Sequence, residues 1–307
     1  MDKSLFLPPN LRVIERGWLS ANQVYLWSDS FLDVIDSGFC THQMQTLALL
    51  RLQMQALLDV TPRFLINTHL HSDHCGGNAA LVDEFHFKLL VPSAEFDSVQ
   101  DWNEPQLGFS ELGQPCPVFS AFGAYQANTV ITLGNLDWEI HQAPGHEDQA
   151  QLLFNPEHKI LISGDALWEK GFGALFPNPF GSPNFDGAFS TIELIAELKP
   201  KVVIPGHGRV FDNVSEAIDY AHERLVYLRK NPERNLIHVV NVLLKFKMLE
   251  WQECQQIKAI KWFESTLMMQ RIAQSLNQPI QELFQQSLHS LVKSKAIQIS
   301  NQSLLNI

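Results

Sequence analysis

Four side chains that commonly bind metal ions lie within six consecutive residues: His69, His71, Asp73 and His74. Four such ligands could not face one point on a regular strand or helix, so the segment is predicted to be a loop. On a loop they can spread around a common centre, and the two glycines that follow allow tight turns. Alternate residues His69 and His71 would reach one ion, while Asp73 and His74 would reach a second ion beside it. Imidazole and carboxylate groups suit zinc and related divalent ions.

Three further residues of the same chemical types each stand next to a glycine after a predicted strand: His146, Asp165 and His207. Each one alone is a weak signal, because a histidine after Pro-Gly is an ordinary turn residue and an aspartate after glycine is an ordinary helix cap. Their combination is stronger. His146 completes a three-histidine site with His69 and His71, and His207 completes the site of Asp73 and His74. Asp165 is then left to bridge both ions. A surface loop that is rich in histidine by chance is the alternative interpretation.

The segment 69–74 reads HLHSDH and resembles the HxHxDH motif of the metallo-β-lactamase superfamily, specifically its dinuclear hydrolases. The resemblance runs in order over about residues 10–230 and includes all seven candidate ligands. It implies an α/β protein, an αβ/βα four-layer sandwich with the metal ions at one edge of the two sheets. Asp36 matches an early-strand aspartate of the family, which supports the ligand loop without binding metal. The alternative for Asp36 is an ordinary turn residue.

The resemblance also implies two divalent metal ions per chain, with zinc as the default and iron or manganese as alternatives. Two cations about 3.5–4 Å apart lower the pKa of a shared water toward neutrality. The predicted activity is therefore attack of a metal-bound hydroxide on the ester or thioester carbonyl of a small molecule. Asp73 is expected to be catalytic as well as a ligand: the family geometry implies that it holds the nucleophile or passes its proton to the leaving group.

The substrate is narrowed by departures from the subgroups of this family. Secreted β-lactamases of this fold carry an export signal and typically lack the bridging aspartate, so drug hydrolysis is disfavoured. Thioesterases of the glyoxalase II type share all seven ligands, but their glutathione-binding Lys and Tyr fall on Ala174 and Phe176 here, which disfavours glutathione. Three aromatic residues after the bridging aspartate are predicted to wall an apolar substrate pocket, with core packing as the alternative: Trp168, Phe172 and Phe176.

The elements that must position these residues follow from hydrophobic periodicity. Strands are predicted at 24–27, 31–35, 64–67, 88–91, 129–133, 138–142, 151–154, 160–163 and 202–204, with helices at 42–58, 77–84, 187–198 and 214–230. After residue 231 three helical patterns, near 236–250, 255–276 and 279–295, precede a hairpin around Asn301-Gln302. We therefore predict a catalytic domain over 1–231 and a small, mainly helical, winged-helix-like domain over 232–307.

Charge divides the chain at the same place. Residues 1–231 carry a net charge of −14 and residues 232–307 a net charge of +3, within a 307-residue chain of net charge −11. The mild positive charge leaves a metal-dependent phosphodiesterase or ribonuclease as an alternative function, although the acidic catalytic part would repel a nucleic acid. A lid, a packing module or a homodimer surface is the preferred role for the C-terminal part. A non-catalytic metal-binding regulator is a third possibility, which the complete ligand set disfavours.

The composition is that of a folded protein, with 45% hydrophobic residues, 20 Phe and 7 Trp. No apolar run approaches the roughly 18 residues that a membrane span requires. The first ten residues contain an early Pro-Pro and do not resemble a signal peptide, so the cytoplasm is the expected compartment.

Overall fold

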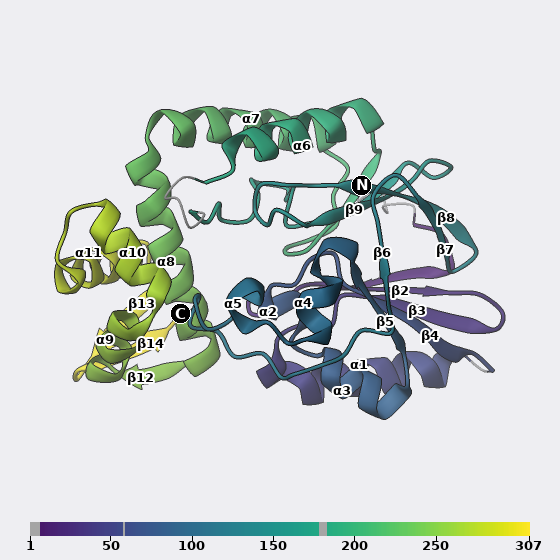
Figure 1. Ribbon diagram of the computed structural model, residues 1–307, viewed down its shortest axis with the longest axis horizontal. Coiled ribbons are helices and arrows are strands. Elements are labelled where there is room, and N and C mark those ends of the chain that lie inside the picture. Colours follow the sequence, from purple (N-terminus) through teal and green to yellow (C-terminus); the bar gives the residue numbers. More distant parts are fainter. Residues whose placement is uncertain (1–6, 58, 178–182) are drawn as a thin grey trace, which may run out of the picture.

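Two mixed β-sheets lie face to face between two layers of helices in the computed structural model, which describes residues 7–57, 59–177 and 183–307 (Figure 1). The first sheet has its six strands side by side in chain order: β1 (Leu11–Ile14), β2 (Gln23–Trp27), β3 (Phe31–Ile35), β4 (Thr61–Ile66), β5 (Lys88–Pro92) and β6 (Gly123–Tyr125). The pairs β1–β2 and β2–β3 are antiparallel, and the strands from β3 to β6 are parallel.

The second sheet follows the order β11-β10-β9-β8-β7. Its strands are β7 (Val130–Leu133), β8 (Leu136–Gln142), β9 (Gln151–Asn155), β10 (Ile160–Gly164) and β11 (Val202–Pro205). The pair β10–β11 is parallel, with Gly164 opposite Pro205, and the other pairs are antiparallel. The carboxyl ends of β10 and β11 therefore lie next to each other.

Neighbouring residues of the central strands are buried on opposite faces, which explains their continuous apolar runs. In β9, Leu153 packs in the core between the two sheets, while Leu152 packs against the helices outside. In β10, Ile162 packs between the two sheets, and Leu161 packs against the helices outside. A strand in the middle of a four-layer sandwich needs apolar residues on both faces, so alternation between apolar and polar residues is lost.

Four longer helices form the outer layers. The first sheet is covered by α1 (Gln43–Ala56) and α3 (Asn78–Phe85), and the second by α6 (Phe185–Leu198) and α7 (Val214–Lys230) (Figure 1). Shorter helical segments lie in the connections: α2 (Ser72–Cys75), α4 (Phe96–Gln100), α5 (Glu104–Leu107) and the 3₁₀ turns Cys40–His42 and Ser93–Glu95. The predicted αβ/βα four-layer sandwich is confirmed.

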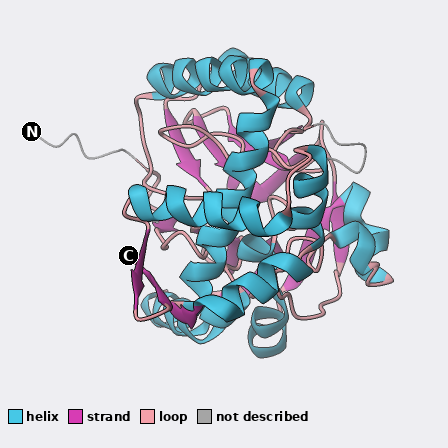
Figure 2. Ribbon diagram, turned by 90° about the vertical axis from the view of Figure 1, so that its left-hand side faces the viewer, coloured by secondary structure: helices cyan, strands magenta, loops and turns pink. Residues whose placement is uncertain are grey.

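The C-terminal part is mainly helical and has a hydrophobic core of its own. It contains α8 (Pro232–Trp251), α9 (Gln256–Ser265), α10 (Leu267–Ser275) and α11 (Ile280–Lys293), with a small sheet of β12 (Glu253–Gln255), β13 (Ile297–Ser300) and β14 (Ser303–Asn306). In the view of Figure 2, the C-terminal helices lie in front of the sandwich and cover one end of it. The boundary predicted at residue 231 falls between α7 and α8, and the division into two domains stays a prediction.

The structure departs from the predicted elements in a few places. The single helix expected over 255–276 is two helices, because Thr266 adopts an extended conformation between α9 and α10. The strands β1, β6 and β12 were not predicted, since three- and four-residue edge strands are defined by their pairing partners more than by their own sequence. The expected hairpin is present, and its turn residues Asn301 and Gln302 both have positive φ. Among the described residues, no helix is both long and apolar enough to cross a membrane.

Candidate metal centre

All seven predicted ligands lie just beyond the carboxyl ends of strands, at one edge of the sandwich. His69, His71, Asp73 and His74 follow β4 and run into the short helix α2. His146 follows β8, while Asp165 and His207 follow the parallel neighbours β10 and β11. Because these strand ends meet at the same edge, residues more than a hundred positions apart become neighbours. They form two groups of side chains that could each hold a metal ion.

The first group is the predicted three-histidine set of His69, His71 and His146, whose ligand atoms lie within 4.8 Å of one another. His71 Nδ1 lies 3.1 Å from His69 Nε2 and 2.8 Å from His146 Nε2. Burial lowers the pKa of all three imidazoles, that of His71 to about 3. They are therefore neutral at pH 7, which is the state that binds metal. His146 Nδ1 donates to the carbonyl of Ala174 at 2.7 Å, so Nε2 presents its lone pair to the group.

The second group contains Asp73, His74, Asp165 and His207. His207 Nε2 lies 3.0 Å from Asp73 Oδ2, and His74 Nε2 lies 3.4 Å from Asp165 Oδ1. The other carboxylate oxygen of Asp165, Oδ2, is 3.5 Å from His146 Nε2 in the first group. Asp165 thus faces both groups, as a bridging ligand must.

Both carboxylates of this group remain ionised. Burial opposes ionisation, but His207 and His74 overcome it and hold the pKa of Asp73 below its usual value. His207 and His74 likewise hold the pKa of Asp165 well below its usual value, again against the effect of burial. Two anionic carboxylates and a set of imidazole nitrogens in one buried place are a donor set that suits divalent cations.

Asp36 lies at the end of β3 and supports the ligand loop through three contacts. Its Oδ1 accepts from the backbone N–H of Thr68 at 2.9 Å, and its Oδ2 accepts from Thr68 Oγ1 at 2.9 Å and from His74 Nδ1 at 2.7 Å. With Nδ1 bound to this carboxylate, His74 Nε2 is a buried nitrogen without a hydrogen-bond partner. A carboxylate that orients a metal-binding histidine in this way is the usual outer partner in such sites. The residues therefore fit a metal ion.

The two groups open into a cavity of about 90 Å³. Trp168 and Phe176, two of the three predicted pocket residues, line it. Trp168 Nε1 also donates to Asp165 Oδ1 at 3.2 Å, and the ring of Phe176 contacts His71 with a centroid separation of 5.5 Å. Both aromatic residues thus touch the candidate ligands directly.

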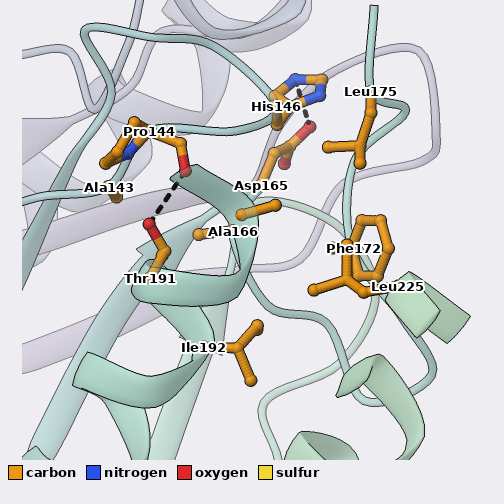
Figure 3. A pocket seen from close by; sticks show the side chains of 11 residues that line it. Ala143, Pro144, His146, Asp165, Ala166, Phe172, Leu175, Thr191, Ile192 and Leu225 are labelled. Atoms are coloured by element: carbon orange, nitrogen blue, oxygen red, sulfur yellow. Dashed lines mark hydrogen bonds and ion pairs between the residues drawn. The ribbon is translucent and has the colours of Figure 1, made fainter. Parts of the chain in front are cut away.

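Phe172, the third predicted pocket residue, does not line this cavity but lines a larger groove that adjoins it. It is buried in the core between the second sheet and the helices α6 and α7. Figure 3 shows Phe172 next to Leu225. Both residues line a void of only about 10 Å³. Phe172 thus has contacts of both predicted kinds, core packing and a pocket wall, and its role in binding substrate stays a prediction.

Several other residues of the cavity wall carried no signal in the sequence. Val242, Leu243 and Phe246 of α8 line it, so the C-terminal part closes the candidate centre. Trp18, from the loop before β2, stacks on the ring of His207 with an interplanar angle of 8° and also lines the cavity. Their apolar character is no different from that of core residues, and only long-range packing brings them to the centre.

A second opening, which also adjoins His71 and His146, is lined by several acidic residues. It has a volume of about 240 Å³ and is lined by four carboxylates, those of Glu95, Glu111, Glu147 and Asp148. Burial raises the pKa of Glu147 to about 7, although the backbone N–H of Gln149 favours its ionised form. Burial likewise raises the pKa of Glu95 well above its usual value, so this opening carries less negative charge than its four carboxyl groups suggest.

Comparison with known proteins agrees with this geometry. The sequence profile described as the metallo-beta-lactamase superfamily matches residues 16–207. The chain is 26% identical over 140 residues to a hydroxyacylglutathione hydrolase of Bdellovibrio bacteriovorus, which is 46% of each chain. It is 25% identical over 160 residues to an acyl-coenzyme A thioesterase of Gallus gallus, covering 49% of this chain and 58% of the relative. The match thus spans about half the length of these curated relatives.

A solved structure extends the similarity to the C-terminal part. A metallo-beta-lactamase family protein from Thermus thermophilus aligns with 98% of this chain and 99% of its own, at 17% sequence identity and a TM-score of 0.59. At this identity the alignment shows the fold. The profile match covers more than half of the chain and includes every candidate ligand, and members of the matched family are metal-binding hydrolases. This chain belongs to the metallo-β-lactamase superfamily.

Proposed function

We propose that this chain is a dinuclear metal-dependent hydrolase that cleaves the thioester or ester bond of a small molecule. The observation that carries the proposal is the position of Asp165, whose two oxygens face the two groups of candidate ligands at the floor of one cavity. When bound, two divalent ions lower the pKa of a water and polarise a carbonyl. We take zinc as the default ion, with iron or manganese as alternatives.

The residues around the ions would transfer the proton, orient the ligands and exclude water. Asp73 lines the cavity, and its lowered pKa keeps it able to accept a proton from the nucleophile and return it to the leaving group. Asp36 orients His74, and Trp168 orients Asp165. Phe246 and the other α8 residues exclude water from the cavity, which strengthens electrostatic interactions within it.

The substrate class rests on the cavity wall and on the relatives. Ala174 and Phe176, which stand where the glyoxalase II pattern has its glutathione-binding Lys and Tyr, both line the cavity and offer glutathione no polar group. The named relatives include a coenzyme A thioesterase as well as a glutathione thioesterase. A thioester with a thiol other than glutathione is the substrate that we favour.

The proposal is tested by metal analysis and a substrate panel. Protein purified without chelator should contain close to two ions per chain, and metal-loaded protein should hydrolyse acyl-thioesters or lactones faster than bis-p-nitrophenyl phosphate. Asp165→Asn should lose one ion and at least about a hundredfold in turnover. Asp186→Asn is the matched control, because Asp186 is an exposed aspartate of α6 that pairs with Arg229 outside the cavity.

Three results would count against the proposal. Less than one ion per chain would favour a non-catalytic metal-binding protein. Metal-dependent cleavage of RNA or of the phosphodiester, abolished by Asp165→Asn, would favour the phosphodiesterase alternative. Equal turnover of Asp165→Asn and Asp186→Asn would remove the bridging role.

A further inference from the structure

A larger groove adjoins the cavity of the metal centre on the side of the C-terminal helices. Its volume is about 570 Å³, within the range of small-molecule binding sites. It shares five lining residues with the cavity: Trp18, Trp168, Ala174, Val242 and Phe246. A substrate whose reacting bond lies over the candidate ligands therefore has room for a longer arm in this groove.

The wall of the groove is mainly apolar, but its charged side chains are of one sign. Lys170, Arg224 and Lys245 line it, and none of its fourteen lining residues, all within the described part of the chain, has a side-chain carboxylate. The molecule as a whole has a net charge of −11, so a groove lined by three cationic side chains differs in charge from the rest of the molecule.

Arg224 of α7 lines the groove, and one of its hydrogen-bond donors has no partner among the described residues. Its Nε is buried and has no partner among the described residues. Its Nη2 donates to His238 Nε2 of α8 at 2.9 Å, and its guanidinium lies 5.7 Å (centroid distance) from the ring of Phe172. Burial, together with the charge of Arg224, lowers the pKa of His238 to about 4, so this histidine is a neutral acceptor.

These contacts hold the guanidinium in place without neutralising it. His238 accepts one N–H but carries no charge, and Phe172 supplies only a ring. By contrast Lys245 is already occupied, because its Nζ donates to Ala296 O at 2.7 Å and to the side chain of Asn306. Arg224 lines the apolar groove, and no carboxylate of the described residues forms an ion pair with its guanidinium, so an anionic acceptor of a ligand would satisfy it best.

We propose that this groove binds an apolar arm of the substrate and that Arg224 receives an anionic group carried by that arm, with Lys170 adding charge at the exposed rim. This inference rests on the proposed hydrolase function. The anion is a carboxylate or phosphate, attached either to the acyl chain or to the thiol.

The test uses matched thioesters and the metal-loaded full chain. Octanoyl and 7-carboxyheptanoyl thioesters of the same neutral thiol, N-acetylcysteamine, differ only in an anion on the acyl side. The octanoyl thioester of 4′-phosphopantetheine places the anion on the thiol side. Wild-type protein should prefer at least one anionic thioester by about tenfold in kcat/KM, the effect of one charge-assisted hydrogen bond. Among neutral acyl chains, kcat/KM should rise from butyryl to octanoyl.

Arg224→Gln should abolish the preference for the anionic thioester by lowering kcat/KM for that substrate about tenfold. Arg229→Gln is the matched control, since Arg229 lies on the same helix but pairs with Asp186 outside the groove. Lys170→Gln changes an exposed residue and should cause a smaller loss of the same kind. Binding of decanoate, measured by calorimetry, should weaken about tenfold in Arg224→Gln and remain unchanged in Arg229→Gln.

The outcomes separate this inference from the proposed function. If the wild-type protein hydrolyses thioesters but has no preference for an anionic arm, or if Arg224→Gln and Arg229→Gln behave alike, the role of the groove is wrong and the hydrolase stands. If no thioester is hydrolysed by the metal-loaded protein, the proposed function fails. The decanoate titrations then still decide whether Arg224 receives an anion.

Discussion

Two of the candidate histidine ligands are oriented by a hydrogen bond from the ring nitrogen that does not face the metal site. His74 turns Nδ1 to Asp36 and keeps Nε2 free, while His146 turns Nδ1 to the carbonyl of Ala174. In each case a fixed acceptor selects one tautomer and one ring direction. The two acceptors lie 38 and 28 residues from their histidines, so the positions that control the centre are spread along the chain.

Asp36→Asn tests this arrangement. The amide retains the shape of the side chain but removes the negative charge that favours the Nδ1–H tautomer of His74. We expect the affinity for the second metal ion to fall about 10- to 100-fold, with a smaller effect on the first. Competition with a chromophoric chelator measures both constants. Equal affinities in the variant and the wild type would show that Asp36 is only a structural turn residue.

Short loops at the ends of β4, β8, β10 and β11 place the ligands, and glycine makes the close approach of two of these loops possible. Gly206, between β11 and His207, donates its N–H to Gly164 O at 2.7 Å and accepts from the N–H of Asn22 at 2.7 Å. A Cβ at Gly206 would clash with the carboxylate of Asp165 and lie 2.8 Å from His74 Cε1. The β11 loop therefore requires glycine for reasons of space at the centre itself.

Gly206→Ala should displace Asp165 and His74 and thereby reduce bound metal to below one ion per chain, with at least about a hundredfold loss of turnover. Gly17→Ala is the matched control, because nothing lies within 4 Å of a Cβ at that exposed position. Metal content by mass spectrometry and far-UV circular dichroism distinguish loss of the centre from loss of the fold. Full metal content in Gly206→Ala would contradict the expected clash.

At the scale of the whole molecule, the C-terminal part completes the centre that the sandwich begins. Helix α8 supplies Val242, Leu243 and Phe246 to the wall of the cavity, and Arg224 of α7 and His238 of α8 join the two parts beside the groove. This placement agrees with a lid, which is one of the three roles predicted for the C-terminal part beside a packing module and a homodimer surface, and the role stays a prediction.

The contact of His238 with Arg224, between α8 and α7, should make the free energy of unfolding depend on pH. The folded pKa of His238 is about 4, below its ordinary value of 6.5, so between these values the unfolded chain binds a proton that the folded chain does not. His238 thus contributes stability that is lost as the pH falls from about 6.5 to 4. In His238→Gln this contribution is absent, and its urea midpoint relative to wild type should rise as the pH falls from 7 to 5. A pH-independent difference would contradict a neutral buried His238.

The sequence by itself determined the family and the fold class. Metal-binding residue types at close spacing after the ends of strands can be recognised from the local sequence alone. Apolar runs of strand length likewise indicate strands that are buried on both faces, as Leu152 and Leu153 illustrate. It also indicated which residues could bind metal, because donor chemistry belongs to the residue type.

Only the tertiary structure decided which side chains surround that centre. Phe172 and Phe176 are four residues apart and chemically identical, yet only Phe176 lines the cavity of the candidate centre, while Phe172 packs in the core and lines the adjoining groove. Trp18 and Phe246 reach the same cavity from opposite ends of the chain. The physical reason is that burial of an apolar side chain contributes nearly the same free energy wherever it occurs, so its place depends on how distant elements pack and not on its local sequence.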